Sequence, residues 1–145
     1  MTEPTDLSAM RRRYDRPPLR RADLAPTWDH QLRAWITDAQ AAGVAGPDAM
    51  VLATASPEGR PSTRTVLLKD VDYRGFVFYT NLESRNSQEL AQNPAVSCLF
   101  PWLALHRQVV VVGAAELVPR DEVEEYFRSR PQGSRIGAWT SRQST

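Results

Sequence analysis

The sequence is poor in the residues that build disulfide-linked or metal-stabilised folds. Its 145 residues include one cysteine, Cys98, and two histidines, His30 and His106. A single cysteine excludes an intrachain disulfide, and we expect a reduced, cytoplasmic setting for the chain. The histidines lie far apart and lack cysteine or acidic neighbours at metal-ligand spacing, so no metal site is expected.

Long apolar runs and an excess of one charge are also missing. No apolar run approaches the roughly 18 residues that a membrane-spanning helix needs. The opening residues, MTEPTDLSAM, do not have the pattern of a secretion signal. The formal net charge is +1. Neither a membrane nor a nucleic-acid partner is therefore expected.

Several short catalytic motifs do not occur in the sequence. It has no G-x-G-x-x-G fingerprint, no P-loop, no H-E-x-x-H and no G-x-S-x-G. These absences argue against a self-contained hydrolase or metalloenzyme. Redox or group-transfer chemistry would require a bound cofactor.

Lysine is almost absent, because 17 of the 18 basic residues are arginine and the other is Lys69. Lys69 lies near the end of the segment RTVLLKD, residues 64–70. A lysine offers a compact charge on a flexible stem, whereas arginine offers a planar fork of donors. Two interpretations stay open: a chance lysine at a solvated strand end, or a site that needs a slim cation.

The chain divides into an arm and one domain. Residues 1–27 are polar, rich in arginine and proline and without periodicity, which predicts a flexible N-terminal arm. Residues 28–145 are predicted to form the domain. Apolar residues at helical spacing predict a first helix that begins at Thr27 or Asp29 and ends at Gly43.

The remaining pattern is rich in short strands. Strands are predicted at residues 49–56, 62–70, 76–81, 95–102 and 107–118, and further helices at 84–94 and 119–130. The first three strands are joined by turns too short for a parallel crossover, so they predict an antiparallel meander. Gly113 is a candidate bulge or bend in the last strand. The predicted fold class is mainly β or α+β, a small antiparallel barrel with flanking helices.

Cationic, amide and hydroxyl side chains gather at the ends of these elements. The set comprises Arg64, Lys69, Tyr79, Thr80, Ser84, Arg85, Gln108, Tyr126, Arg130, Ser134, Gln143 and Ser144. Arginine, lysine and a helix N-terminus bind phosphate, and glutamine suits a heteroaromatic ring. Each residue also has a structural explanation, since Arg85 fits a solvated helix start and Tyr126 fits the rim of a core. Regular alternation places Arg64 and Lys69 on opposite faces, so a joint role requires a bulge or two ligands.

Several segments resemble the pyridoxamine 5′-phosphate oxidase family and occur in that family's order. They are MRRRY, RTVLLKD, FVFYTNLESR, NPAVSCLFPW, RQVVVVG, EYFRSRPQGSRIGAW and SRQS. Together they cover nearly the whole chain beyond the arm, and the segment that begins EYFRSRP is the most specific. The resemblance implies an FMN-binding split β-barrel that forms a homodimer with FMN at the subunit interface.

The resemblance also implies which residues bind the two ligands. The implied FMN contacts are Arg64, Thr65, Val66, Leu67, Leu68, Lys69, Tyr79, Thr80, Arg85, Asn86, Gln108, Gln143 and Ser144. The implied substrate contacts are Lys69, Tyr126, Arg130 and Ser134, with Arg11 and Tyr14 in a segment that covers the site. The implied reaction, in vitamin B6 metabolism, is oxidation of pyridoxamine or pyridoxine 5′-phosphate by O2 to pyridoxal 5′-phosphate and H2O2, with FMN as cofactor.

Two features depart from the family pattern. Asn86 stands where the family usually has lysine, and the missing cation should weaken FMN binding by about 1 kcal/mol. The sequence stops at SRQST, whereas the family continues with further strands, so we expect a C-terminally incomplete barrel. Two alternatives stay open: part of a longer oxidase, or a shortened relative that binds FMN or pyridoxal phosphate without catalysis.

Overall fold

The computed structural model describes residues 17–129 of the chain, and its elements follow the predicted order. They are η2 (Arg21–Asp23), α1 (Trp28–Ala41), β1 (Ala49–Ala55), β2 (Pro61–Asp72), β3 (Gly75–Phe78), α2 (Arg85–Gln92), β4 (Ala95–Trp102), η3 (Leu103–Leu105), β5 (Arg107–Ala114) and α3 (Arg120–Ser129). Residues 17–27, the described part of the expected arm, thus contain one short 3-10 helix.

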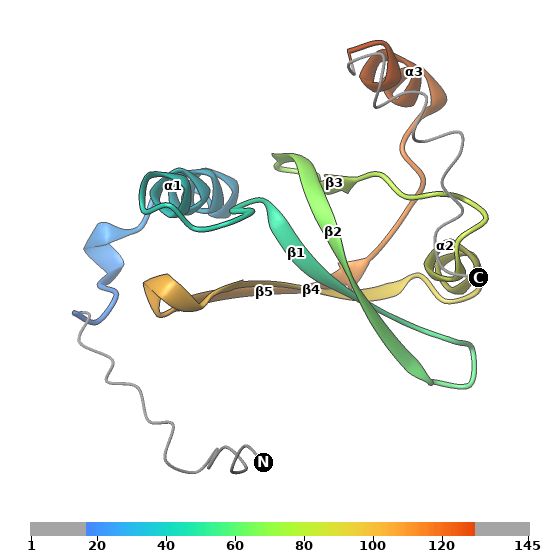
Figure 1. Cartoon of the computed structure of the whole chain (residues 1–145), viewed down its shortest axis with the longest axis horizontal. Coiled ribbons are helices and arrows are strands. Elements are labelled where there is room, and N and C mark those ends of the chain that lie inside the picture. The colour runs from blue at the N-terminus through green and yellow to red at the C-terminus, as the bar shows by residue number, and fades with distance from the viewer. Residues whose placement is uncertain (1–16, 130–145) are drawn as a thin grey trace, which may run out of the picture.

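The five strands form one antiparallel sheet in the order β3-β2-β1-β4-β5. Tight turns join β1 to β2 and β2 to β3, as the short connections predicted. Helix α2 then carries the chain across to β4, on the other side of β1 (Figure 1). The sheet curls into a half-barrel, which confirms the predicted antiparallel fold class.

Helices α1 and α2 pack on the same face of the sheet, which we call the helix face. Alternation of strand residues places Met50, Leu52 and Thr54 of β1 on this face. The apolar core forms where α1 lies against it, and its two largest buried side chains are Phe100 and Trp102. The indole N–H of Trp102 donates to the carbonyl oxygen of Pro47 at 3.0 Å, so its one polar atom is satisfied.

The limits of α1 match the sequence signals. Thr27 is its extended N-cap residue, and Gly43 lies just past its C-cap with φ of 71°. This left-handed conformation favours glycine, and it ends the helix. No helix within residues 17–129 combines the length and the apolar character that a bilayer crossing requires.

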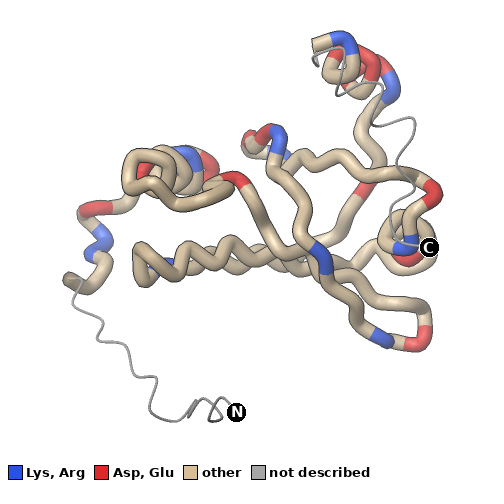
Figure 2. Tube along the Cα trace, in the orientation of Figure 1, with Lys and Arg blue, Asp and Glu red and all other residues tan. Residues whose placement is uncertain are grey.

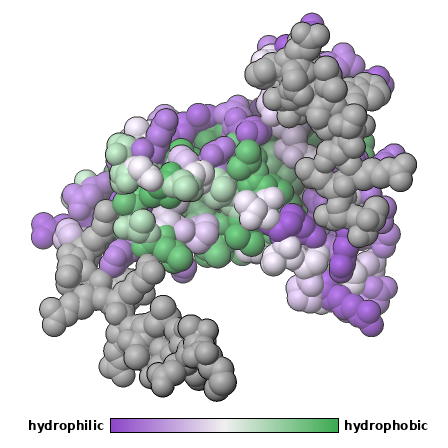
Figure 3. Space-filling view, viewed as in Figure 1, coloured by the Kyte–Doolittle hydropathy of each residue, from purple (hydrophilic) through white to green (hydrophobic). Residues whose placement is uncertain are grey.

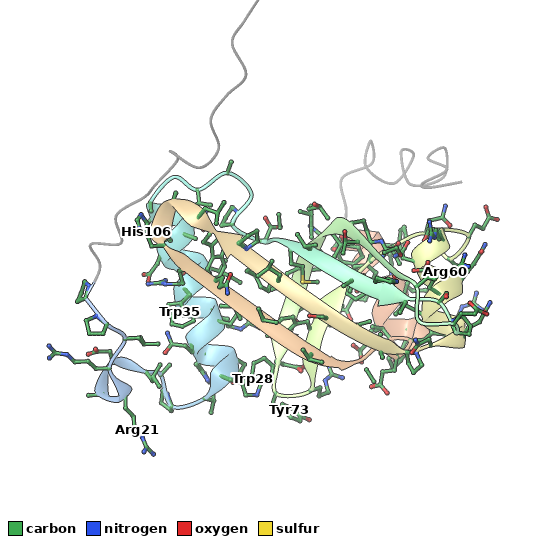
Figure 4. All side chains as sticks on the ribbon, turned by 90° about the horizontal axis from the view of Figure 1, so that it is seen from below. Arg21, Trp28, Trp35, Arg60, Tyr73 and His106 are labelled. Atoms are coloured by element: carbon green, nitrogen blue, oxygen red, sulfur yellow. The ribbon has the colours of Figure 1, made fainter. Side chains whose placement is uncertain are left out.

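The opposite side of the sheet, which we call the open face, carries apolar side chains in solvent. Its most exposed large residues are Leu67, Val110 and Val112, at 45%, 55% and 78% exposure. Figure 4 looks onto this side, with β4 and β5 nearer to the viewer than α1. Figure 2 shows that β4 and β5 carry almost no charge, and Figure 3 shows hydrophobic side chains gathered near the centre of the view.

Two details of β5 differ from the prediction. Its register with β4 runs without a shift through Gly113, so the expected bulge is not at this glycine. The strand ends at Ala114 rather than at residue 118, because β4 begins at Ala95 and offers no partner beyond that pair. The shift in register lies instead in β2, between Leu68 and Asp70.

Candidate functional site

The β2 bulge affects which face of the sheet the side chains at the end of RTVLLKD lie on. Before the bulge, Arg64 and Leu68 face the helices, while Leu67 lies on the open face. Lys69 and Asp70 are then exposed in succession. A bulge adds one residue to its strand and re-aims the side chain beside it. Lys69 keeps the position opposite to Arg64 that regular alternation gives it, and the bulge changes the alternation from Asp70 onward, so that Val71 is buried again.

Charged neighbours hold the bulge on both sides. The Nζ of Lys69 lies 3.9 Å from a carboxylate oxygen of Asp48, the residue before β1. Arg33 of α1 donates to Asp70 at 2.8 Å and also to the carbonyl oxygen of Val71. Lys69 therefore lies at a bulge that ion pairs hold in place, and its side chain is 32% exposed.

Two of the predicted FMN-binding arginines meet at one buried carboxylate, that of Glu89 in α2. The Nε of Arg85 donates to Glu89 Oε1 at 2.9 Å. The Nη2 of Arg64 lies 3.5 Å from Glu89 Oε2. Ser62 donates to that same oxygen at 2.6 Å, and Thr54 donates to it as well. One carboxylate thus joins β1, β2 and α2.

Glu89 is ionised throughout the physiological pH range. The hydroxyl groups of Ser62 and Thr54 lower the pKa of Glu89 from 4.5 to about 2, with Arg85 adding to the effect. Burial opposes this shift, because it disfavours the charged form. These three donors outweigh burial, so the two guanidinium groups face a permanent negative charge.

The N-terminus of α2 has the properties of an anion site. Ser84 is its N-cap residue, yet the Ser84 side chain makes no capping hydrogen bond to the helix. Its hydroxyl instead donates to the Asn81 carbonyl and to Asn86 Oδ1, both at 2.5 Å. The Ser84 side chain therefore leaves the first backbone N–H groups of α2 uncapped, beside the exposed Arg85.

Asn86 is part of the protein interior rather than the surface. It is 5% exposed, and its Nδ2 donates to Thr80 Oγ1 at 3.0 Å. Together with the Ser84 contact, this ties the first turn of α2 to the segment that follows β3. The residue that replaces the usual lysine therefore supports the loop of Thr80 and does not present a charge.

Tyr79 and Tyr126, predicted to bind cofactor and substrate respectively, stack on each other. Their ring centroids are 3.8 Å apart with an interplanar angle of 5°. Partial burial, reinforced by Tyr126 and nearby carboxylates, raises the pKa of Tyr79. Helix α3 stands apart from the sheet in Figure 1, and this stack joins it to the end of β3.

Gln108 lies away from this cluster, near the turn between β4 and β5. It lines a cavity of about 430 Å³ with Trp35 and His106. Figure 4 shows Trp35 and His106 at the end of the sheet opposite to Arg60. Six other predicted residues lie outside the described residues: Arg11, Tyr14, Arg130, Ser134, Gln143 and Ser144. Within residues 17–129, no three His, Cys, Asp or Glu side chains are grouped to hold a metal ion.

Sequence reasoning missed the residues that organise the cluster, namely Glu89, Thr54 and Ser62. A glutamate four residues after Arg85 was the available signal, since this spacing permits an ion pair along a helix. Such pairs are usually solvated. Only the packing of α2 against Thr54 and Ser62 makes Glu89 a buried centre.

Comparison with known proteins decides the family. The family model for pyridoxamine 5′-phosphate oxidase matches residues 36–145, about three quarters of the chain. The chain belongs to the pyridoxamine 5′-phosphate oxidase family. This confirms the resemblance that the sequence motifs carried.

Family relatives with curated names are similar over nearly the whole chain. A pyridoxine/pyridoxamine 5′-phosphate oxidase from Frankia casuarinae is 54% identical over 97% of this chain and 53% of the relative. The protein of that name from Kineococcus radiotolerans is 60% identical over 84% of this chain and 54% of the relative. The chain therefore spans about half the length of these two oxidase-family relatives.

Solved structures agree with the family fold. PhzG from Burkholderia lata, in complex with tetrahydrophenazine-1-carboxylic acid, is 31% identical with a TM-score of 0.74, covering 79% of this chain and 56% of that one. An FMN-binding protein related to pyridoxamine 5′-phosphate oxidase, from Nostoc punctiforme, has a TM-score of 0.64 at 17% identity, covering 79% and 63%. The second likeness shows the shared split-barrel fold alone.

Proposed function

We propose that this chain forms the FMN-binding half-barrel of an oxidase that acts on pyridoxamine 5′-phosphate and pyridoxine 5′-phosphate. O2 is the proposed oxidant, and pyridoxal 5′-phosphate and H2O2 are the proposed products. One observation carries the proposal within this family: Arg64 and Arg85, from different elements, are held at Glu89 beside the N-terminus of α2.

The donor groups at this point suit the phosphate of FMN. Arg85 supplies a guanidinium fork, and α2 supplies backbone N–H groups together with the positive end of its dipole. When bound, FMN supplies the electron acceptor of the reaction, which no side chain of the chain can provide. The protein's own task is to bind two phosphates and to align substrate with cofactor.

The substrate phosphate is assigned to Lys69 and Tyr126. Lys69 lies on the side of β2 opposite to Leu68 and beside the bulge, and the stack with Tyr79 ties Tyr126 to the end of β3. A slim ammonium reaches a phosphate in a crowded site more easily than a guanidinium does. This assignment gives the single lysine of the chain a function.

We further propose a homodimer in which the open face is covered by a second copy. Leu67, Val110 and Val112 would otherwise leave an apolar patch in solvent. Sedimentation analysis of the chain should give a mass of about twice 16.3 kDa. A monomer at micromolar concentration would contradict this part of the proposal.

A second candidate is a binding module that holds FMN or pyridoxal phosphate without turnover. The groups around Glu89 and the N-terminus of α2 support this candidate as well, because holding a phosphate requires no turnover. Both candidates require FMN or pyridoxal phosphate to bind, but only the oxidase requires turnover.

An FMN titration followed by flavin fluorescence tests the proposal, with riboflavin as the unphosphorylated control. Saturable binding that prefers FMN is the expected result, and equal binding of both flavins would overturn the assignment of the phosphate site. Peroxide release from pyridoxamine 5′-phosphate by the FMN-loaded chain then separates the candidates. An FMN-loaded chain that releases none would be the binding module.

Replacing Lys69 with alanine tests the substrate assignment. Because the charge would be lost at the substrate phosphate, we expect KM for pyridoxamine 5′-phosphate to rise about tenfold or more, with FMN affinity nearly unchanged. Steady-state kinetics and the FMN titration measure the two effects. An equal loss of both would place Lys69 on the cofactor.

A further inference from the structure

We infer that Glu89 is the positioning residue of the phosphate site: it holds the guanidinium groups of Arg64 and Arg85 in the arrangement that distinguishes FMN from an unphosphorylated flavin. The inference rests on the proposed function, because it names the residue on which the phosphate preference of that site depends. Glu89 acts through the two arginines and need not touch the ligand.

The two oxygens of Glu89 have different partners. Oε1 accepts the Nε–H of Arg85 at 2.9 Å. Oε2 accepts from Ser62 at 2.6 Å and from Thr54, and it lies 3.5 Å from Nη2 of Arg64. The second oxygen fixes the carboxylate to two strands, so the first oxygen presents a fixed acceptor to Arg85.

Arg64 is bound by the same hydroxyl groups as Glu89. Its Nη1 donates to Thr54 Oγ1 at 2.5 Å and its Nη2 donates to Ser62 Oγ at 2.7 Å. Thr54 and Ser62 thus bridge the carboxylate and the Arg64 guanidinium. Removing the negative charge would leave this half-buried cation without its compensating partner.

Arg85 depends on Glu89 in another way. Its side chain is 63% exposed, so few other contacts restrict it, and an exposed arginine samples many rotamers. The bond at Nε fixes the inner edge of the guanidinium and leaves the outer edge directed away from the carboxylate. A guanidinium that is already held loses less freedom when a phosphate binds.

Glu89 also removes positive charge from the site, since two arginines and one carboxylate leave a net charge of +1. On charge alone, its removal would strengthen the binding of a phosphate. The positioning role predicts the opposite sign. The direction of the change therefore separates the two roles.

The test compares Glu89→Gln with Glu83→Gln in the full 145-residue chain. Glutamine keeps the size of Glu89, and its oxygen can still accept from Ser62 and Thr54, but its amide nitrogen cannot accept from Arg85. Glu83 is exposed and lies just before the N-cap of α2, so its substitution makes the same charge change nearby. Titrations with FMN and with riboflavin give the ratio of the two affinities.

We expect Glu89→Gln to lower the FMN-to-riboflavin affinity ratio about tenfold, or about 1.4 kcal/mol. Glu83→Gln should leave the ratio within about twofold, because its charge is solvated. The NMR signal of the Arg85 Nε–H should also shift in Glu89→Gln and stay in place in Glu83→Gln.

Three results would overturn the inference. An unchanged ratio in Glu89→Gln, even with lower stability, would make Glu89 a merely structural residue. A higher ratio, or an equal change in both variants, would make it a source of charge only. If the chain without any substitution binds FMN and riboflavin equally, the proposed function is wrong. The phosphate site that Glu89 is inferred to arrange would then be wrong as well.

Discussion

The helix face of the sheet is built differently at its two ends. Beneath α1 it is apolar, and Met50, Phe100 and Trp102 are at most 2% exposed. Beneath α2 it is polar: Thr54 and the charged Glu89 are both buried, and the Thr54 hydroxyl donates to the Glu89 carboxylate. Apolar packing stabilises without specifying a geometry for a ligand, whereas a satisfied polar network fixes the positions of its charges. We therefore assign stability mainly to the α1 end and ligand binding to the α2 end.

The polar end is fully satisfied, which is why it can be buried at all. Among the described, non-exposed residues, no buried side-chain nitrogen or oxygen lacks a hydrogen-bond partner. A partly satisfied network would destabilise the fold more than an apolar contact of the same size. Substitution of the buried members of the polar end, Thr54 and Glu89, is therefore expected to lower stability sharply.

The largest effect is expected at the apolar end, from Phe100→Ala. The Phe100 ring is fully buried and packs 5.4 Å from Trp102 and 5.9 Å from Phe76 between ring centroids. Its removal should lower the free energy of unfolding by about 3–5 kcal/mol. Urea denaturation measures this loss, and Leu103→Ala, at a side chain 67% exposed, is the matched control. A loss no greater than that of the control would refute the division between the two ends.

The second effect is an acid sensitivity located at the polar end. The pKa of Glu89 is lowered from 4.5 to about 2 in the fold. Its contribution to stability is therefore present above pH 4.5 and is lost as the pH falls toward 2. Thermal unfolding between pH 7 and pH 2 should show a shallower decline below pH 4.5 in Glu89→Gln than in the unchanged chain. Parallel declines would place the acid sensitivity elsewhere.

The third effect is a loss of FMN affinity with little change in stability, and it is expected from Arg85→Ala. Because Arg85 is 63% exposed, its loss should leave the melting temperature nearly unchanged. FMN affinity should fall by about 1.5–3 kcal/mol through the lost bonds to the phosphate, while riboflavin affinity stays constant. Arg60→Ala, in the turn between β1 and β2, is the control arginine. A similar loss of FMN affinity in both variants would indicate a general electrostatic effect.

The smallest effect is expected from Asn86→Lys, which adds a cation at the polar end instead of removing one. The added cation should raise FMN affinity about fivefold, or about 1 kcal/mol. The buried bonds to Thr80 and Ser84 would be lost, so the melting temperature should fall by a few degrees. Calorimetry and flavin titration measure the two changes. Weaker FMN binding would show that the Asn86 contacts contribute more to the site than a lysine would.

Local sequence signals predicted most of the fold because they depend on neighbouring residues. The limits of α1, the start of α2 at Ser84 and the antiparallel meander follow from caps, glycines and short turns. The β2 bulge was named only as a condition for Arg64 and Lys69 to act together. No glycine marks it, and the glycine that suggested a bulge, Gly113, lies in regular register.

The candidate site was predictable as a set of residues but not as an arrangement. The family resemblance supplied Arg64, Arg85 and Asn86, yet it could not show that Asn86 is buried. It also gave no role to Glu89, because a glutamate in a polar helix is normally solvated. Its burial depends on the packing of α2 against β1 and β2, which are separate from it in the sequence.

The single lysine at the β2 bulge gives this chain a selective chemical handle. Reagents that acylate side-chain amines have one target among its 145 residues, and that target is partly exposed. Acylation of Lys69 would remove the ammonium charge assigned to the substrate phosphate, so the labelled chain should bind a phosphorylated vitamer as poorly as Lys69→Ala does. Protection of this amine from labelling by a phosphorylated vitamer would provide a binding assay that needs neither turnover nor bound flavin.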